Sequence, residues 1–270
     1  MGRAAGGRGG VSATSALAQQ WAAGGVQPGD TLLLHSNVTR TLLAHRRAGR
    51  TISPADVLAS FLQALGPDGT LLLPLFNFGF AKGVPFDIRH TPSEMGALTE
   101  AGRLHPEAVR TGHPIYSFAV IGARSERFRG VDNVSGFGED SPFGILREMN
   151  GTIGALDLDE QNSMTFYHHV EEIRRVPYRH FKDFTGTYIG HDGRPGTRTY
   201  RLYVRNLEQG VVGEGNPAAE MMWARGLYRG DRPGLGSGLR TIKARDMFDF
   251  LSSLIDSSQA LGTMYSIRPT

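Results

Sequence analysis

The segment from residue 30 to residue 76 limits the fold most strongly, because it contains two apolar runs separated by one helical pattern. Asp30–Ser36 is a continuous apolar run after the turn P-G, as expected for a strand buried on both faces. Ser53 is placed to cap a helix that Pro54 opens and that runs to Leu65. After the turn G-P-D-G, Thr70–Phe76 is a second buried strand. A strand, a helix and a strand with short connections predict an α/β core.

The rest of the chain continues this alternation and changes after residue 177. A helical pattern begins near residue 14, and we expect further helices at residues 93–104, from about 162 and at 243–255, with strands at 117–122 and 151–156. Residues 187–207 are rich in Thr, Tyr and Val around the turn H-D-G-R-P, which is typical of a hairpin, and residues 226–238 form a Gly/Pro-rich loop. The predicted fold class is α/β, with a mixed central sheet flanked by helices and an additional β-rich C-terminal portion.

Length and composition predict one domain and exclude several enzyme classes. The 270 residues suit one large domain at residues 14–270, after a Gly/Arg-rich tail at residues 1–13 that we expect to be disordered. The chain has no cysteine, which excludes disulfides, thiolate metal sites and a cysteinyl intermediate. No run approaches the roughly 20 apolar residues of a membrane span, and the first ten residues lack the apolar core of a secretory signal. We expect a soluble, cytoplasmic protein.

The basic side of the charge balance is almost entirely arginine. The net charge is +3, and lysine supplies only Lys82, Lys182 and Lys243 among 29 basic residues. Arginine suits phosphate groups because its planar fork donates two parallel hydrogen bonds, although a compositional bias of the coding sequence gives the same excess. No basic run is interleaved with aromatic residues, so we expect neither nucleic-acid nor membrane partners.

The stretch M-T-F-Y-H-H-V-E-E at residues 164–172 places imidazole and carboxylate groups on one helix. With about 100° per residue, Thr165, His168 and Glu171 share a face, opposite the apolar stripe of Phe166, Val170 and Ile173. A carboxylate beside an imidazole is expected to raise the imidazole pKa and fix its tautomer, which suits a general base. A solvated polar face gives the same spacing. His168 and His169 diverge and H-E-x-x-H is absent, so we expect no metal.

Two further stretches carry polar groups next to predicted elements. R-T-G-H-P-I-Y-S at residues 110–117 places Arg, His and Ser before a strand, where they can line a pocket or only cap a loop. In G-E-D-S-P-F-G at residues 138–144, Ser141 can cap a helix opened by Pro142, and exposed amides at such a start also attract phosphate or an oxyanion. Neither the G-x-G-x-x-G nor the P-loop fingerprint follows a strand, which excludes Rossmann and P-loop sites.

Six segments taken in order carry a resemblance to a known family. They are G-D-T-L-L-L-H-S at 29–36, L-G-P-D-G-T-L-L-L-P at 65–74, F-D-I-R-H-T-P-S-E-M-G-A-L-T-E at 86–100, V-R-T-G-H-P-I-Y-S at 109–117, G-E-D-S-P-F-G at 138–144 and T-F-Y-H-H-V-E at 165–171. With these segments the chain resembles the antibiotic N-acetyltransferase family, typified by aminoglycoside 3-N-acetyltransferases, from about residue 29 to residue 255.

The resemblance implies transfer of an acetyl group from acetyl-CoA to an amine. In the family, the T-x-x-H-x-x-E helix supplies the catalytic histidine, which falls on His168, with Thr165 and Glu171 at the matching places. His168 is suited to take the amine proton, and backbone amides or the Thr165 hydroxyl are candidate donors to the oxyanion. Without cysteine, direct transfer in a ternary complex is favoured over a thiol-bound intermediate; a serine ester is not formally excluded.

The same resemblance, together with the crevices that form at strand ends and helix starts, indicates where the ligands bind. Residues expected to contact acetyl-CoA lie after the first strand, around the start of the helix expected at residues 93–104 and at the strand expected at residues 117–122: Ser36, Asn37, Thr91, Ser93, Gly96, Ala97 and Ser117. Residues expected to contact the acceptor are Arg110, His113, Tyr116 and Arg179. A homodimer is a further possibility.

One departure from the family pattern bears on the acceptor. Where aminoglycoside enzymes commonly read H-P-T-H-S, this chain reads H-P-I-Y-S, so Tyr116 replaces an imidazole. Aminoglycosides are polycations, whereas this chain is basic and poor in acidic clusters, which favours an anionic, nucleotide-linked aminoalkylphosphonate and a resemblance to the phosphonate-antibiotic biosynthetic member. The alternatives are an aminoglycoside 3-N-acetyltransferase that confers resistance and a non-catalytic CoA-binding protein.

Overall fold

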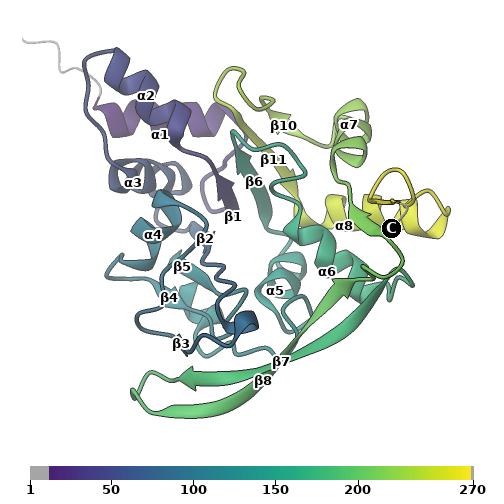
Figure 1. The fold of residues 1–270 in the computed structure, drawn as a ribbon. Coiled ribbons are helices and arrows are strands. Elements are labelled where there is room, and N and C mark those ends of the chain that lie inside the picture. The colour runs from purple at the N-terminus through teal and green to yellow at the C-terminus, as the bar shows by residue number, and fades with distance from the viewer. Residues whose placement is uncertain (1–11, 269–270) are drawn as a thin grey trace, which may run out of the picture.

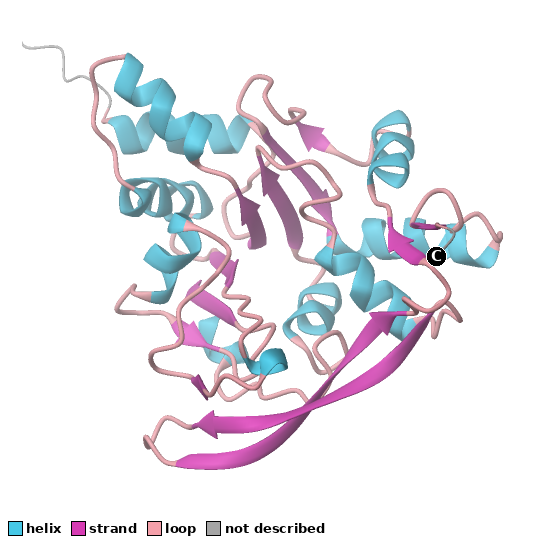
Figure 2. Ribbon diagram, in the orientation of Figure 1, coloured by secondary structure: helices cyan, strands magenta, loops and turns pink. Residues whose placement is uncertain are grey.

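A seven-stranded mixed sheet forms the centre of the computed structural model, which describes residues 12–268 (Figures 1 and 2). Its strand order is β10 (Arg229–Gly230), β11 (Leu239–Lys243), β6 (Thr152–Leu156), β1 (Thr31–Ser36), β2 (Thr70–Pro74), β5 (Phe118–Gly122) and β4 (Val109–Arg110). The strand β1 is parallel to both β2 and β6, and the other neighbours are antiparallel. The predicted α/β class with a mixed sheet is confirmed. The predicted disordered tail lies outside the described residues except for residues 12 and 13.

Helices cover both faces of this sheet. One side carries α1 (Ala13–Ala23), α3 (Pro54–Leu65) and α4 (Ala97–Arg103), with α2 (Thr39–Arg47) above them, and the other carries α5 (Pro142–Glu148), α6 (Thr165–Ile173) and α8 (Ala244–Asp256) (Figure 1). Side chains alternate between the two faces of a strand, so Leu32 and Leu34 enter the core under α1 and α3, whereas Leu33 enters the core on the side of α6. The continuous apolar run in β1 is therefore explained by burial on both faces.

A long hairpin crosses the edge of the molecule below the sheet (Figure 2). It consists of β7 (Arg179–Ile189) and β8 (Pro195–Arg205), joined by the turn at residues 190–194, and β3 (Phe86–Asp87) adds a short third strand. We expected the hairpin at residues 187–207, and the structure confirms its turn but begins its first strand at Arg179. A second small sheet pairs β9 (Val211–Gly213) with β12 (Tyr265–Ile267).

Several element boundaries follow the predicted capping chemistry, and others do not. Ser53 accepts from the amide of Asp56 while Asp56 accepts from the amide of Ser53, a capping box at the predicted start of α3. The helix expected from residue 93 begins only at Ala97, after Gly96 with φ of 113°. The helices α2 and α7 (Asn216–Ala224) were not predicted; in α2 only Thr41 is buried, so it lacks an apolar stripe.

Short 3₁₀ turns at Phe80–Lys82 and Ser125–Phe128 complete the described elements. Within residues 12–268, no helix is both long enough and apolar enough to cross a membrane.

Candidate active site

Helix α6 and strand β7 bring together an imidazole, a carboxylate and a guanidinium. Nδ1 of His168 lies 2.9 Å from Oε2 of Glu171, and Nε of Arg179 lies 2.8 Å from the same oxygen. Glu171 is fully buried, and the Arg179 side chain is 4% exposed. Arg179 also donates to the main-chain oxygen of Tyr203 at 3.0 Å. One carboxylate oxygen therefore connects the histidine to a buried cation.

Local geometry explains why these three residues meet. Glu171 follows His168 by three positions, so both lie on one face of α6. The chain then reverses at the end of the helix, where the amide of Val176 donates to the main-chain oxygen of Glu171 at 3.2 Å. This reversal returns Arg179, the first residue of β7, to the face of the helix that carries Glu171.

Burial and charge set the protonation states of this group. Burial lowers the pKa of His168, and the charge of Arg179 lowers it further, against the opposing effect of Glu171. Burial acts to raise the pKa of Glu171, but the charge of Arg179 and the hydrogen bond from His168 outweigh it and lower that pKa overall. Glu171 does raise the pKa of His168, as expected, but burial and the charge of Arg179 outweigh it, so that pKa is lowered overall. At neutral pH, His168 is a neutral imidazole beside an ionised carboxylate.

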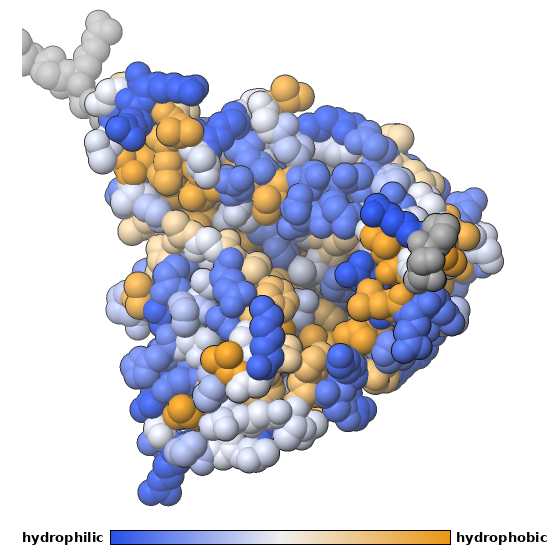
Figure 3. Space-filling model, viewed as in Figure 1, coloured by the Kyte–Doolittle hydropathy of each residue, from blue (hydrophilic) through white to orange (hydrophobic). Residues whose placement is uncertain are grey.

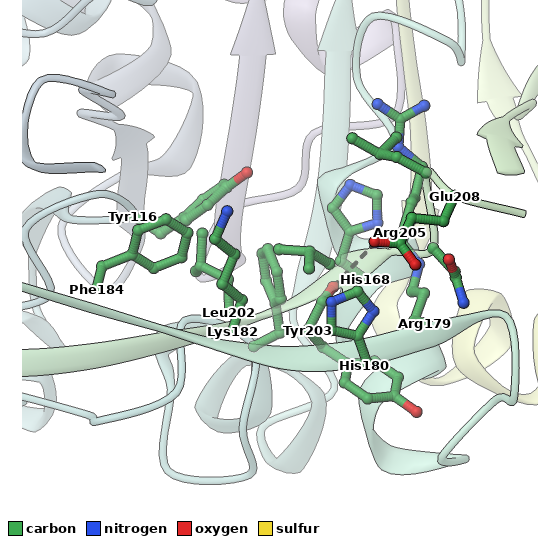
Figure 4. Close-up of a pocket in the computed structure, with 14 residues that line it drawn as sticks. Tyr116, His168, Arg179, His180, Lys182, Phe184, Leu202, Tyr203, Arg205 and Glu208 are labelled. Carbon is green, nitrogen blue, oxygen red and sulfur yellow. Dashed lines mark hydrogen bonds between the residues drawn. The ribbon is translucent and has the colours of Figure 1, made fainter. Parts of the chain in front are cut away.

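His168 opens onto a cavity of about 730 Å³. Its lining comes from α6, the hairpin strands, the segment that follows β8 and the loops before β5 and α5: Tyr116, Phe137, His168, Arg179, His180, Lys182, Phe184, Leu202, Tyr203, Val204, Arg205, Asn206, Leu207 and Glu208. Tyr116, Lys182 and Phe184 lie on one side of the cavity, with His168, Arg179 and Arg205 on the other (Figure 4). In the space-filling view, the middle of this face is hollowed and bordered by apolar residues (Figure 3). With Nδ1 bound to Glu171, Nε2 is the imidazole nitrogen left for a ligand.

Phe137 supports the imidazole from the side. Its ring meets the ring of His168 edge-on at 5.1 Å, and Tyr116 packs on Phe137 at 4.7 Å. His169 helps to fix the position of Phe137, because its Nδ1 lies 2.7 Å from the main-chain oxygen of Phe137. Burial lowers the pKa of His169 to about 4, so its ring is neutral. The second histidine of the H-H pair thus points away from the cavity and holds the loop that faces the first.

Other polar side chains of α6 are buried as well, so the polar side of this helix is not a solvent-exposed face. Glu172 is 3% exposed and accepts from Ser135 at 2.7 Å. Oγ1 of Thr165 lies 2.9 Å from Nε2 of His35, at the end of β1, and Thr165 does not line the cavity. Burial lowers the pKa of His35 to about 4. The three motif residues of α6 therefore have different surroundings, with Thr165 held by the central sheet.

Two of the residues expected to bind the acceptor are committed to the protein interior. Arg110 donates to the main-chain oxygens of Ile88 at 3.1 Å and Thr91 at 2.7 Å, and burial lowers its pKa to about 10. Nδ1 of His113 accepts from the amides of Ile115 and Tyr116, at 3.2 and 3.0 Å. Burial lowers the pKa of His113 to about 3. The other two expected residues, Tyr116 and Arg179, do line the cavity.

The residues expected to bind the cofactor lie outside this cavity, in two places. Ser36 is the last residue of β1 and Asn37 follows it, where the amide of Asn37 donates to the main-chain oxygen of Leu156 of β6 at 2.8 Å. The second group lies around the start of α4 and consists of Thr91, Ser93, Gly96, Ala97 and Ser117. The hydroxyls of Ser93 and Thr99 are hydrogen-bonded to each other, and the hydroxyl of Ser117 accepts from the guanidinium of Arg110. Gly96 and Ala97 are exposed, and a Cβ on Gly96 would meet open space.

Apart from Arg179, motif-based reasoning did not identify the cavity residues of the hairpin. His180, Lys182 and Phe184 line one wall from β7, and Leu202 and Arg205 contribute from β8. The sequence feature that could have identified them is the spacing of residues 180, 182 and 184, because every second residue of a strand faces the same side. Among residues 12–268, no group of three potential metal-ligating side chains is present.

A buried carboxylate that orients a neutral imidazole at a cavity is an arrangement able to accept a proton from a bound ligand. The family model described as aminoglycoside 3-N-acetyltransferase matches residues 44–255. The chain therefore belongs to the aminoglycoside 3-N-acetyltransferase family and is an acyltransferase.

Known proteins similar to this chain agree with that assignment. Aminoglycoside N(3)-acetyltransferase VII of Streptomyces paromomycinus is 27% identical over 87% of this chain and 88% of its own. Among solved structures, aminoglycoside acetyltransferase AAC(3)-Xa has a TM-score of 0.74 at 24% identity and covers 90% of this chain and 92% of its own. AAC-IIIb in a binary complex with CoASH has a TM-score of 0.72 at 22% identity, with coverage of 96% and 99%. The solved structures confirm the fold.

Proposed function

We propose that this protein transfers an acetyl group from acetyl-CoA to a primary amine of an antibiotic or antibiotic precursor, with His168 as the general base. The observation that carries this proposal is the orientation of His168, whose Nδ1 is bound to Glu171 while its ring lines the cavity. Nε2 is then the acceptor for the proton of a bound ammonium group.

The charges around His168 suit this step. The lowered pKa keeps the imidazole neutral and able to accept a proton at neutral pH. When Nε2 takes the proton, the positive charge that forms lies next to ionised Glu171, which stabilises it. The first proton passes from Nε2 to solvent, and the neutral amine attacks the thioester carbonyl. Nε2 then takes the second proton from the attacking nitrogen and passes it to the departing thiolate as the C–S bond breaks. Arg179 keeps Glu171 ionised throughout.

Acetyl-CoA supplies the acetyl group as an activated thioester when bound. The residues present fit such a ligand in size and charge, because a cavity of about 730 Å³ next to His168 carries Lys182 and Arg205 in its wall. Ser36, Asn37 and the exposed residues at the start of α4 remain our candidates for the rest of the cofactor. The related AAC-IIIb structure with CoASH supports acetyl-CoA as the donor.

The relatives favour an aminoglycoside amine as the acceptor. The Streptomyces paromomycinus relative is named for acetylation at N(3) of aminoglycosides, and the family model carries the same description. With an aminoglycoside as its acceptor, the protein would be a resistance-type enzyme. This is the first of the two alternatives to the anionic acceptor that the composition favoured.

A second candidate acceptor is favoured by the lining of the cavity. Lys182, Arg205 and His180 face it, Arg179 is paired with Glu171, and Glu208 is the carboxylate of the wall. An acceptor with a phosphonate or nucleotide phosphate beside its amine would pair with these cations, whereas a polycation would be repelled. The same cations also suit the phosphates of acetyl-CoA, so only measurements with acceptors separate the two functions.

The test is release of free thiol from acetyl-CoA with two sets of primary amines, kanamycin-like aminoglycosides and nucleotide-linked aminoalkylphosphonates. Release with either set and not without amine supports acetyl transfer, and the ratio of kcat/KM values identifies the acceptor class. Binding of acetyl-CoA without release for any amine would show a non-catalytic CoA-binding protein and overturn the proposal.

A further inference from the structure

Three buried polar atoms in the group around His168 and Glu171 lack a hydrogen-bond partner within residues 12–268: Oε1 of Glu171, Nε of Arg179 and the hydroxyl oxygen of Tyr178. Nε of Arg179 still forms an ion pair with Oε2 of Glu171 at 2.8 Å, which leaves Oε1 of Glu171 and the Tyr178 hydroxyl as the two atoms to be explained. Leaving a buried polar group unpaired is destabilising, so most such groups in native proteins are paired directly or through water. A carboxylate oxygen can only accept and a phenol can donate, so the two unpaired atoms are chemically complementary.

The surroundings of Tyr178 fix its ring in this position. The ring stacks on Tyr265 of β12, with 3.7 Å between centroids and 20° between planes. Its main-chain oxygen accepts from the amide of Asn206 at 3.0 Å. Tyr178 also directly precedes Arg179, which pairs with the other oxygen of the same carboxylate. With ring and backbone both held, the hydroxyl has little freedom to find another partner.

The hydroxyl keeps its proton under all physiological conditions. Burial raises the pKa of Tyr178, and the negative charge of Glu171 raises it further, against the opposing charge of Arg179. The phenol therefore remains a hydrogen-bond donor, and Glu171 is the negatively charged group that raises its pKa.

We propose that Tyr178 is a positioning residue that donates its hydroxyl proton to Oε1 of Glu171, directly or through one bridging water. Oε2 of Glu171 contacts His168 and Arg179, so this third interaction holds the carboxylate plane towards the imidazole. Tyr178 touches no reacting atom and acts on the base through Glu171. Its catalytic consequence rests on the proposed function of His168, whereas the interaction itself does not.

The interaction has a definite electrostatic sign. A donor at Oε1 withdraws negative charge from the carboxylate and so weakens its stabilisation of imidazolium at His168. Without this donor, Glu171 holds the proton of His168 more strongly, and the pKa of His168 rises. Other charged or titratable groups that bear on the pair are Arg179, Arg205, Tyr203 and Tyr265, and His180, Lys182 and Glu208 line the same cavity as His168. Arginine and tyrosine side chains ordinarily titrate at about pH 10 or above, outside the range of an imidazole.

The experiment compares the wild type with Tyr178→Phe, which keeps the ring and its stacking on Tyr265 but removes the donor. Titration of His168 by NMR needs neither acetyl-CoA nor acceptor, so it tests the interaction even if the proposed function is wrong. One hydrogen bond of about 0.5–1.5 kcal/mol predicts a rise of about 0.3–1 pH unit in the pKa of His168. In the active enzyme, the acidic limb of kcat/KM should move upward by a similar amount.

The matched control is Tyr228→Phe, because Tyr228 donates to a buried carboxylate elsewhere, Oε2 of Glu160 at 2.7 Å. This variant loses stability but should leave the titration of His168 unchanged. An unchanged pKa of His168 in a folded Tyr178→Phe protein would overturn the proposal. If that variant does not fold, a crystal structure of the wild type with resolved waters decides: a hydroxyl more than about 4 Å from Oε1 with no bridging water is incompatible with the interaction.

Discussion

Nε of Arg179 lies 2.8 Å from Oε2 of Glu171, so the carboxylate that orients His168 is itself ion-paired with a buried guanidinium. This contact decides which form of each group is present. Burial would favour a protonated glutamic acid, and the charge of Arg179 reverses that preference. The same positive charge disfavours imidazolium at His168. Arg179 thus keeps both members of the pair in the forms that a general base requires.

Replacing His168 by alanine should lower turnover by about 10²–10⁴-fold, as expected for the loss of a general base. Acetyl-CoA affinity should change little, because the imidazole acts on the amine. Thiol release and calorimetric binding of acetyl-CoA measure the two effects separately. His191→Ala is the control, since His191 is an exposed histidine at the hairpin turn. Near-wild-type turnover in His168→Ala at neutral pH would remove His168 from the mechanism.

Replacing Arg179 by methionine should destabilise the protein by about 3–5 kcal/mol, the usual cost of leaving a buried charge without its partner. The pKa of Glu171 should rise, because burial then acts without the opposing cation. Urea unfolding of Arg179→Met, Glu171→Gln and the double variant measures the coupling. Arg127→Ala breaks the exposed pair with Glu148 and should change the free energy of unfolding little. If the loss in free energy of unfolding of the double variant equals the sum of the losses of the two single variants, the two residues are not coupled and the prediction is wrong.

Local signals in the sequence account for much of the central fold. The strand β1, the capped helix α3 and the strand β2 all follow the predicted order, because continuous apolar runs and the Ser53 cap act over a few residues. The helix α2 was not predicted because its sequence has no apolar stripe. The start of α4 was displaced by the bonds of Ser93 to Glu100 and Thr99, which no local pattern reports.

The candidate site was only partly predictable for the same reason. The spacing of His168 and Glu171 on one helix is a local property, and their contact follows from it. The pairing of Glu171 with Arg179 needs the chain reversal after α6. The hydrogen bond between Thr165 and His35 joins residues 130 positions apart, which spacing cannot show. The inward face of the hairpin also depends on how the whole strand pair lies against α6.

Replacing Lys182 by glutamine should raise KM for an anionic acceptor by about tenfold or less, since a partly exposed ion pair contributes about 1 kcal/mol. The same variant should leave KM for a polycationic aminoglycoside unchanged or lower it. Increasing salt should weaken binding of the anionic acceptor in the wild type, because screening acts over roughly 10 Å at 0.1 M. Lys82→Gln is a control in the 3₁₀ turn, outside the cavity lining. Equal effects on both acceptor classes would leave Lys182 without a role in choosing between them.

Three buried histidines should make the protein lose stability steadily as the pH falls below about 6.5. Burial lowers the pKa of His35 and His169 to about 4 and that of His113 to about 3, from an ordinary value of 6.5. Below pH 6.5 the unfolded chain takes up these protons and the folded chain does not, so the stabilisation present above that pH is lost as the pH falls towards the folded values. Each such group contributes a slope of about 1.4 kcal/mol per pH unit, and the three together give about 4 kcal/mol per unit between roughly pH 6 and pH 4. Urea unfolding at pH 7, 6 and 5 measures this slope, and His169→Gln should reduce it by about a third. A free energy of unfolding that stays constant from pH 7 to pH 5 would show that these rings protonate in the folded state, and that burial is not what controls their titration.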